Sequence, residues 1–133
     1  MVTIALEGIT VLADDVARLT TFFEDGLGLQ VSVREEHYVA FSGPGVRLAI
    51  FRRALMGANT GNHPSFEGDR GAQAFELNFE CADREVVEQT YLHVVAHGAT
   101  PISAPVETDW GHFTGFFADP EGNIHSLFAV LAD

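Results

Sequence analysis

The chain carries an internal repeat, because the same order of predicted elements occurs in both of its halves. In each half, a predicted strand contains a Glu seven residues before an Asp that opens a predicted helix. Glu7 precedes Asp14 in this way, and Glu76 precedes Asp83. Two unrelated α+β segments would not be expected to share this spacing. The repeat therefore predicts two copies of one supersecondary unit within 133 residues.

The first half reads as a strand, a helix and three further strands. Asp14 is the predicted N-cap of the helix, and apolar positions recur at helical spacing from Val16 to Phe23 until Gly26 and Gly28 end it. The predicted strands are Thr3–Leu12, Leu29–Arg34, Tyr38–Ser42 and Val46–Arg52.

The second half repeats this order after a polar, glycine-rich segment, residues 55–73, which reads as a linker or mobile loop. A helix is predicted from the N-cap Asp83 to about Ala96. The predicted strands are Ala74–Cys81, Ile102–Val106, Phe113–Ala118 and Ile124–Val130. We therefore predict an α+β fold in a single domain: two βαβββ modules (1–54 and 74–133) joined by the linker 55–73.

The composition of the chain further restricts which classes of function are expected. The chain is 47% hydrophobic, yet no apolar run is long enough to span a membrane. A single cysteine, Cys81, excludes an internal disulfide, and we expect a cytoplasmic protein. A net charge of −12 disfavours nucleic acid as a partner. The same charge fits either simple solubility or attraction for a cationic ligand, and both readings stay open.

Strand alternation predicts which side chains line a groove. In the strand Ala74–Cys81, Phe75 begins the apolar face, and the polar residues point to the other side. If the two sheets curve round a shared central groove, the faces without helices would line it. Because side chains alternate along each strand, the residues expected to line the groove are Glu7, Ile9, Arg47, Ala49, Phe51, Glu76, Asn78, Glu80, Ile124, Ser126 and Phe128. Trp110 reads equally well as a lid of this groove or as a core residue.

Three stretches resemble the vicinal oxygen chelate superfamily, which includes glyoxalases, bleomycin-resistance proteins and extradiol dioxygenases. They are EGITVLADDVARLTTFFEDGLGL (7–29), ELNFECADREVVEQTYLHVVAHGA (76–99) and WGHFTGFFADPEGNIHSL (110–127). The last is similar to the family signature W-G-x…F-x-D-P-x-G-N-x-x-E-L. The resemblance implies the paired βαβββ fold with a central groove and a homodimer.

The resemblance also implies four metal-binding positions, which carried over by register are Glu7, Ala49, Glu76 and Ser126. In metal-binding members these are His, Gln or Glu. Here Ala49 has no donor atom and Ser126 is a poor ligand at neutral pH, so we expect no resident metal. A non-standard divalent site that combines His112 or His125 with the two glutamates remains open.

Two functions follow as hypotheses. The first is a metal-free binding protein of the bleomycin-resistance type, whose aromatic and acidic groove holds a small cationic molecule. The second is a glyoxalase-type lyase, isomerase or dioxygenase, using a non-standard metal site or Glu7 or Glu76 as a general base. No nucleophile elbow, phosphate-binding loop or CxxC motif points elsewhere.

Overall fold

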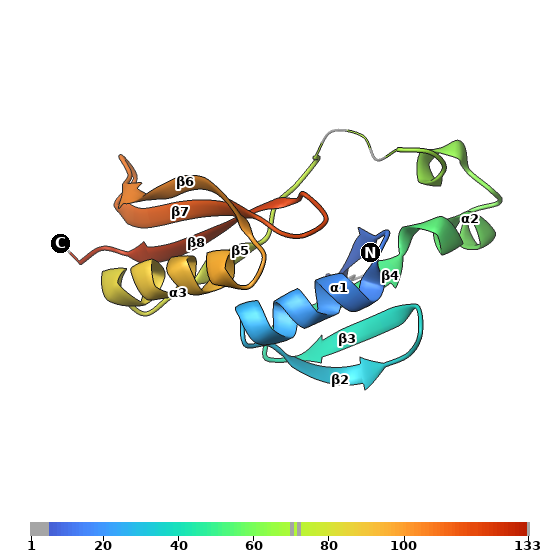
Figure 1. Cartoon of the computed structure of the whole chain (residues 1–133), viewed down its shortest axis with the longest axis horizontal. Coiled ribbons are helices and arrows are strands. Elements are labelled where there is room, and N and C mark those ends of the chain that lie inside the picture. Colours follow the sequence, from blue (N-terminus) through green and yellow to red (C-terminus); the bar gives the residue numbers. More distant parts are fainter. Residues whose placement is uncertain (1–5, 70, 72, 133) are drawn as a thin grey trace, which may run out of the picture. The chain divides into compact units, whose positions relative to one another are not determined.

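Each half of the chain folds as β–α–β–β–β, so the predicted repeat is confirmed in the structure, a computed structural model that describes residues 6–69, 71 and 73–132. Within these residues the strands form two four-stranded sheets, with strand orders β1-β4-β3-β2 and β5-β8-β7-β6 (Figure 1). The first and last strands of each half pair in parallel, and the other pairs are antiparallel.

The elements have the following bounds. The first half contains β1 (Gly8–Ala13), α1 (Val16–Thr21), the π-helical turn η1 (Phe22–Gly26), β2 (Gln30–Arg34), β3 (Tyr38–Ser42), β4 (Arg47–Arg52), the 3-10 turn η2 (Arg53–Leu55), α2 (Met56–Asn59) and the 3-10 turn η3 (Pro64–Phe66). The second contains β5 (Asn78–Glu80), α3 (Arg84–Ala96), β6 (Thr100–Glu107), β7 (His112–Ala118) and β8 (Ile124–Val130).

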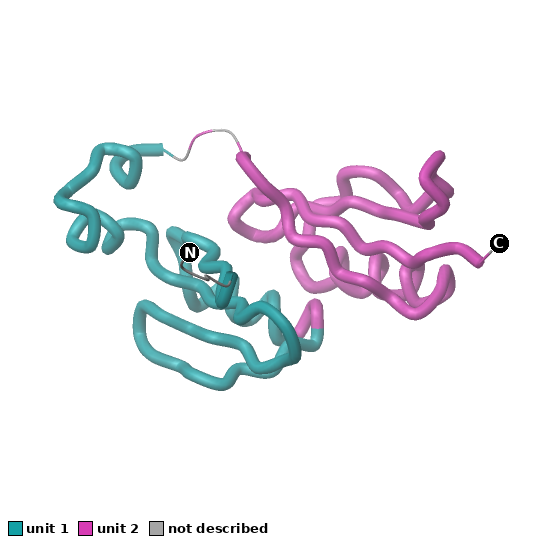
Figure 2. The backbone as a smooth tube through the Cα atoms, turned by 180° about the vertical axis from the view of Figure 1, so that it is seen from behind, with its two compact units in different colours: residues 1–24, 28–70 teal, residues 25–27, 71–133 magenta. Residues whose placement is uncertain are grey.

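The chain divides into two compact units (Figure 2). Of the described residues, 6–24 and 28–69 belong to unit 1, and 25–27, 71 and 73–132 belong to unit 2. Most of the segment predicted as a linker, 55–73, thus belongs to unit 1 and contains α2 and η3. None of the helices in the described part of the chain is long and apolar enough to cross a membrane.

The core of unit 1 lies between α1 and the strands β3 and β4. Phe23 and Ile50 are fully buried, and the rings of Phe23 and Phe41 have centroids 5.6 Å apart. Since Phe41 faces the helix, its strand neighbours of opposite parity face away from it. The sheet therefore has one face covered by α1 and a second face that bears Tyr38 and Phe51.

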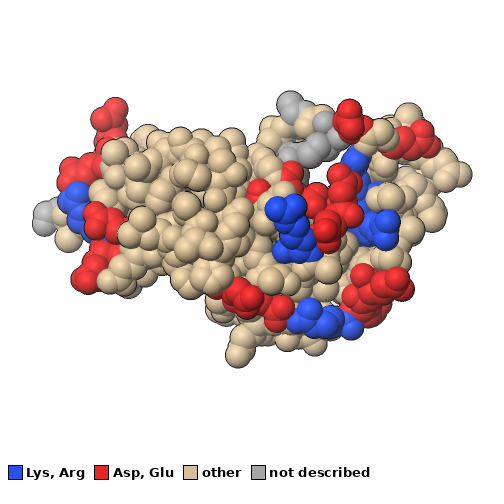
Figure 3. All heavy atoms as spheres, viewed as in Figure 1, with Lys and Arg blue, Asp and Glu red and all other residues tan. Residues whose placement is uncertain are grey.

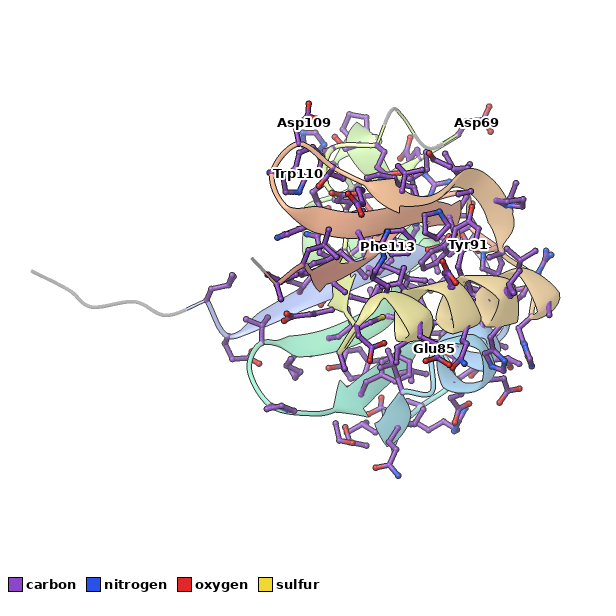
Figure 4. The ribbon with its side chains drawn as sticks, turned by 90° about the vertical axis from the view of Figure 1, so that its left-hand side faces the viewer. Asp69, Glu85, Tyr91, Asp109, Trp110 and Phe113 are labelled. Carbon is purple, nitrogen blue, oxygen red and sulfur yellow. The ribbon has the colours of Figure 1, made fainter. Side chains whose placement is uncertain are left out.

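The core of unit 2 lies between α3 and the sheet, with Tyr91 and Phe113 pointing into the space between them (Figure 4). Tyr91 is buried and donates its hydroxyl to the carbonyl of Phe116 at 3.0 Å. Gly115 on β7 has no room for a side chain, because a Cβ there would lie 2.8 Å from Cγ of Pro105. This close approach lets Pro105 of the edge strand β6 pack on β7 where the register of the two strands is irregular.

Three local predictions are corrected by the structure. The N-cap of α1 is Asp15, whose carboxylate accepts from the backbone N–H of Arg18 at 3.0 Å, whereas Asp14 pairs with Arg53. The strand predicted as Ala74–Cys81 is regular only over Asn78–Glu80. The strand predicted from Thr3 begins at Gly8, and residues 3–5 lie outside the described residues.

Candidate functional site

The pocket that we consider as a functional site lies within unit 1 and has a volume of about 440 Å³. This size suits a small-molecule ligand. Its walls come from β1, β3 and β4 on the sheet side and from α2 and η3 on the other. The lining residues are Thr10, Leu12, Tyr38, Phe51, Met56, Asn59 and Phe66.

Strand register explains why these side chains converge. Parallel pairing places Leu12 beside Phe51, and antiparallel pairing places Tyr38 beside the same Phe51. Paired residues on neighbouring strands point to the same side of a sheet. These three side chains therefore form one wall on the face opposite α1. The helical segment after β4 supplies the second wall.

The same register changes the predicted face of β1. Ile9 pairs with Leu48, while Thr10 pairs with Ala49. The face predicted for Ile9 is therefore occupied by Thr10 and Leu12. Of the predicted lining residues in unit 1, Phe51 lines the pocket, and Ala49 is fully buried beside Thr10.

A charged network lies next to the pocket. The guanidinium of Arg47 donates to both carboxylate oxygens of Glu7, at 2.7 and 3.2 Å, and from Nη1 to the hydroxyl oxygen of Tyr38 at 2.6 Å. Because Tyr38 lines the pocket, the network reaches its wall. Gly8 leaves space for the arginine, since a Cβ there would lie 2.7 Å from Nη2 of Arg47.

This network fixes the charge state of Glu7. The hydrogen bonds from Arg47 hold the pKa of the Glu7 carboxyl below its usual range, and the same contact raises the pKa of Arg47. A carboxylate with a lowered pKa is a weak base. Glu7 is thus suited to orient Arg47 and Tyr38 rather than to abstract a proton.

Four of the predicted site residues of unit 2 lie on the sheet face opposite α3, and they form no cluster of carboxylates: Asn78, Glu80, Ser126 and Phe128. Ser126 is 3% exposed and donates from Oγ to Oδ1 of Asn78 at 2.7 Å. Glu80 pairs in register with Phe128 and is exposed. Glu76 lies before β5 and is also exposed.

Trp110 is neither a core residue nor buried. It lies in the turn before β7, is 66% exposed, and packs edge-on against His112 (Figure 4). His112 in turn stacks on Phe128, with ring centroids 4.9 Å apart. These side chains, together with Val106 and Val130, form what we call the apolar patch of unit 2.

The four family metal positions do not fit a metal centre in this chain. Ala49 offers no donor, Glu7 is ion-paired with Arg47, and the Ser126 hydroxyl donates to Asn78. Among the residues that the structure describes, no group of three or more His, Cys, Asp or Glu side chains could hold a metal ion. The two histidines considered for a non-standard site are otherwise engaged: His112 stacks on Phe128, and buried His125 pairs with Asp119.

Cys81 is the one thiol in the sequence, and it is unsuited to nucleophilic chemistry. Burial raises the pKa of the Cys81 thiol above its ordinary value, although a hydrogen bond with Thr90 acts in the opposite direction. A thiol with a raised pKa is protonated at neutral pH and reacts slowly.

Several pocket residues were not predicted from the sequence: Thr10, Leu12, Tyr38, Met56, Asn59 and Phe66. Thr10 and Leu12 could have been found by pairing β1 with β4 first and then asking which side chains of β1 share a face with Ala49 and Phe51. Met56, Asn59 and Phe66 lie in the segment that was read as a linker. The apolar Met56 and the aromatic Phe66 within a polar stretch were the available signal.

Comparisons with known proteins give the family. Residues 5–126 match the family model of the Glyoxalase/Bleomycin resistance protein/Dioxygenase superfamily. The uncharacterized protein YraH of Bacillus subtilis (strain 168) is 26% identical over 127 residues, which cover 92% of this chain and 96% of that protein.

Two solved structures share the fold. One is a glyoxalase/bleomycin resistance protein/dioxygenase family enzyme from Burkholderia phytofirmans PsJN, with a TM-score of 0.84, 23% identity, and coverage of 95% of this chain and 98% of that chain. The other is a lactoylglutathione lyase from Agrobacterium tumefaciens, with a TM-score of 0.67, 18% identity, and coverage of 94% and 92%. The resemblance seen in the sequence is confirmed, and the chain belongs to the Glyoxalase/Bleomycin resistance protein/Dioxygenase superfamily.

Proposed function

We propose that this chain is a metal-free binding protein that holds a small, partly aromatic molecule in the pocket of unit 1. The observation that carries the proposal is the composition of the pocket walls. Tyr38, Phe51 and Phe66 supply three aromatic rings, and Thr10 and Asn59 add polar groups. Apolar walls with a few polar groups are typical of sites that bind and orient a small ligand.

The ligand we favour carries positive charge. Aromatic faces attract cations, and each well-placed contact contributes about 0.5–2 kcal/mol. The chain has a net charge of −12, which raises the local concentration of cations. The guanidinium of Arg47 does not oppose this preference strongly, because Glu7 neutralises it through two hydrogen bonds.

An enzymatic function is less well supported by these residues. A glyoxalase-type lyase, isomerase or dioxygenase would need a metal centre or a carboxylate base. The donor set at the four family positions does not suit a transition metal. Glu7 has a lowered pKa, and Glu76 lies exposed outside β5. Binding without chemistry therefore agrees better with the site.

We also propose that the protein forms a homodimer through the apolar patch of unit 2. The strands β6, β7 and β8 contain one Asp, Glu, Lys or Arg residue in their sequences, Glu107. Figure 3 shows the α3 side of unit 2, and the middle of that surface also carries few charged side chains. Val106, Trp110 and Val130 are each more than half exposed. Exposed apolar side chains gathered on one sheet face mark an interaction surface.

The test of ligand binding compares three probes of one shape. N-methylquinolinium is a planar cation, quinoline is neutral at pH 7, and quinoline carboxylate is an anion. Isothermal titration should give the tightest binding for the cation. Replacing Phe66 by Ala should weaken that binding about fivefold, since one aromatic contact contributes about 1 kcal/mol.

Phe75→Ala is the matched control, because Phe75 is exposed and outside the pocket. Equal effects of the two substitutions would show that the probe does not bind in this pocket. Tighter binding of the anion than of the cation would reject the proposed ligand charge while keeping the pocket.

A further inference from the structure

The last turn of α3 carries two histidines, His93 and His97, on one face of the helix. Residues four apart in a helix are neighbours on its surface. The two imidazole rings have centroids 4.1 Å apart and an interplanar angle of 38°. Both residues are exposed, so both rings are accessible from solvent.

The hydrogen bonds of these rings decide which ring nitrogens carry protons. His93 Nε2 lies 2.8 Å from the carbonyl oxygen of Asp25, and His97 Nδ1 lies 2.9 Å from the carbonyl oxygen of His93. A carbonyl oxygen can only accept, so each of these nitrogens carries a proton. When the rings bind a metal, the lone pairs are on Nδ1 of His93 and Nε2 of His97.

This arrangement matches the second shell of protein metal sites. A histidine that ligates a metal through one nitrogen generally donates its other N–H to a carbonyl or carboxylate, which fixes the tautomer and orients the ring. Here the carbonyls of Asp25 and His93 perform that role for the two rings. Both imidazoles are thus already held in the tautomer that a metal requires.

The electrostatic surroundings also favour a cation. His97 caps the C-terminal end of α3, where the helix dipole carries partial negative charge. The sequence contains no Lys or Arg after Arg84, so unit 2 provides no cationic side chain near this end of the helix. The chain as a whole is strongly acidic.

From these observations we propose that His93 and His97 form a two-imidazole site for a divalent transition metal. Imidazole nitrogen is a favoured ligand of Zn²⁺, Ni²⁺ and Cu²⁺. No third His, Cys, Asp or Glu joins the pair within the described residues, so water completes the coordination and the ion exchanges readily. The site uses none of the four family metal positions.

The bound ion would also have a structural effect. His93 lies against the carbonyl of Asp25, and His97 is the C-cap of α3. An ion that holds both rings would brace the last turn of α3. Binding to the folded state alone raises stability in proportion to the logarithm of ligand excess.

The experiment uses the full chain without a histidine tag, titrated with Ni²⁺ by calorimetry and followed by thermal unfolding. We expect one ion per chain and a rise in Tm with metal concentration. His97→Gln should weaken Ni²⁺ binding at least tenfold, and His93→Gln should do the same. His37→Gln, in unit 1, is the matched control and should leave the affinity unchanged. With Cu²⁺, electron paramagnetic resonance should show two nitrogen ligands in the native chain and one in His97→Gln.

A second variant separates metal binding from helix capping. His97→Lys places a positive charge at the helix end and removes the ligand nitrogen at neutral pH. We expect this variant to fold with a native-like Tm without metal and to show no metal-dependent rise in Tm. The proposal is overturned if Ni²⁺ fails to bind, or if His93→Gln and His97→Gln bind it as tightly as the native chain.

Discussion

His125 donates from Nε2 to Oδ2 of Asp119 at 2.7 Å, and both side chains are buried in unit 2. The other ring nitrogen, Nδ1, accepts from the backbone N–H of Leu77 at 3.2 Å, so the proton of the neutral ring is on Nε2. Asp119 Oδ1 also accepts from the backbone N–H groups of Glu121 and Asn123. One buried pair thus joins the turn before β8 to the segment that leads into β5.

The first prediction concerns this pair. Asp119→Ala removes the carboxylate that accepts from His125, Glu121 and Asn123, and each hydrogen bond to a charged group contributes about 1.5–3 kcal/mol. We therefore expect a loss of at least about 3 kcal/mol in the free energy of unfolding, measured by urea denaturation. Asp109→Ala, at an exposed turn position of the same unit, is the control and should change little. A similar loss in both variants would contradict the role of the buried pair.

The second prediction concerns pH and Glu7. Its folded-state pKa is lowered by Arg47, so the ion pair stabilises the folded protein above the ordinary carboxyl pKa of about 4.3. This contribution is lost as the pH falls through the lowered pKa. Glu7→Gln should therefore reduce the acid-side decline of Tm, measured between about pH 3 and pH 7. Glu67→Gln is the control and should show the native dependence of Tm on pH. The prediction is contradicted if Glu7→Gln shows that native dependence as well.

A third prediction concerns the position at which metal-binding relatives have Glu. Ser126→Ala removes the hydroxyl that donates to Asn78, and we expect a loss of about 1 kcal/mol in unfolding free energy. Ser126→Glu places an unpaired carboxylate at a position that is 3% exposed, and should cost about 3–5 kcal/mol. Ser103→Ala, exposed on β6, is the control. An unfolding free energy of Ser126→Glu equal to that of the native chain would contradict the prediction.

Arg53 leads to a fourth prediction. It donates from Nε to Asp14 at 2.9 Å and from Nη2 to the carbonyl of Gly68 at 2.7 Å. The bond to Gly68 joins the two ends of the segment that contains α2 and η3. The side chain of Arg53 is 16% exposed. Arg53→Ala should accelerate hydrogen exchange over residues 56–68, and Arg52→Ala, at the exposed neighbouring position, should not. In the native chain, residues 55–69 should still exchange faster than the strands.

The fifth prediction tests the proposed dimer. Sedimentation velocity at micromolar concentration should show a dimer for the native chain. The double change Val106→Glu with Trp110→Glu places two charges in the apolar patch of unit 2 and should give a monomer. Leu92→Glu changes a side chain on α3 that is 72% exposed, and should leave the dimer intact. A native monomer, or a dimer that survives the double change, would reject this interface.

Sequence periodicity predicted the repeat, the fold class and the buried face of α1, because these depend on local spacing. It failed where a residue far away in the sequence determines the local structure. Asp14 was predicted to cap α1, but Arg53 draws it into an ion pair, and Asp15 caps the helix instead. Which side chains of β1 share a face with those of β4 depends on how the two strands pair, so Ile9 was placed on the face that Thr10 occupies. The pocket wall from α2 and η3 follows from tertiary packing, which a polar, glycine-rich stretch does not reveal.

The parallel pairing in each unit has a consequence for how the chain folds. A helix and two strands separate β1 from β4 along the chain, and the same kinds of element separate β5 from β8. Closing such long loops is entropically unfavourable before the contacts form. The antiparallel hairpins β3–β4 and β7–β8 are local and can form early. We therefore expect the transition state for folding to contain a hairpin and helix in each unit, with β1 and β5 added late, so that substitutions in these two strands mainly accelerate unfolding.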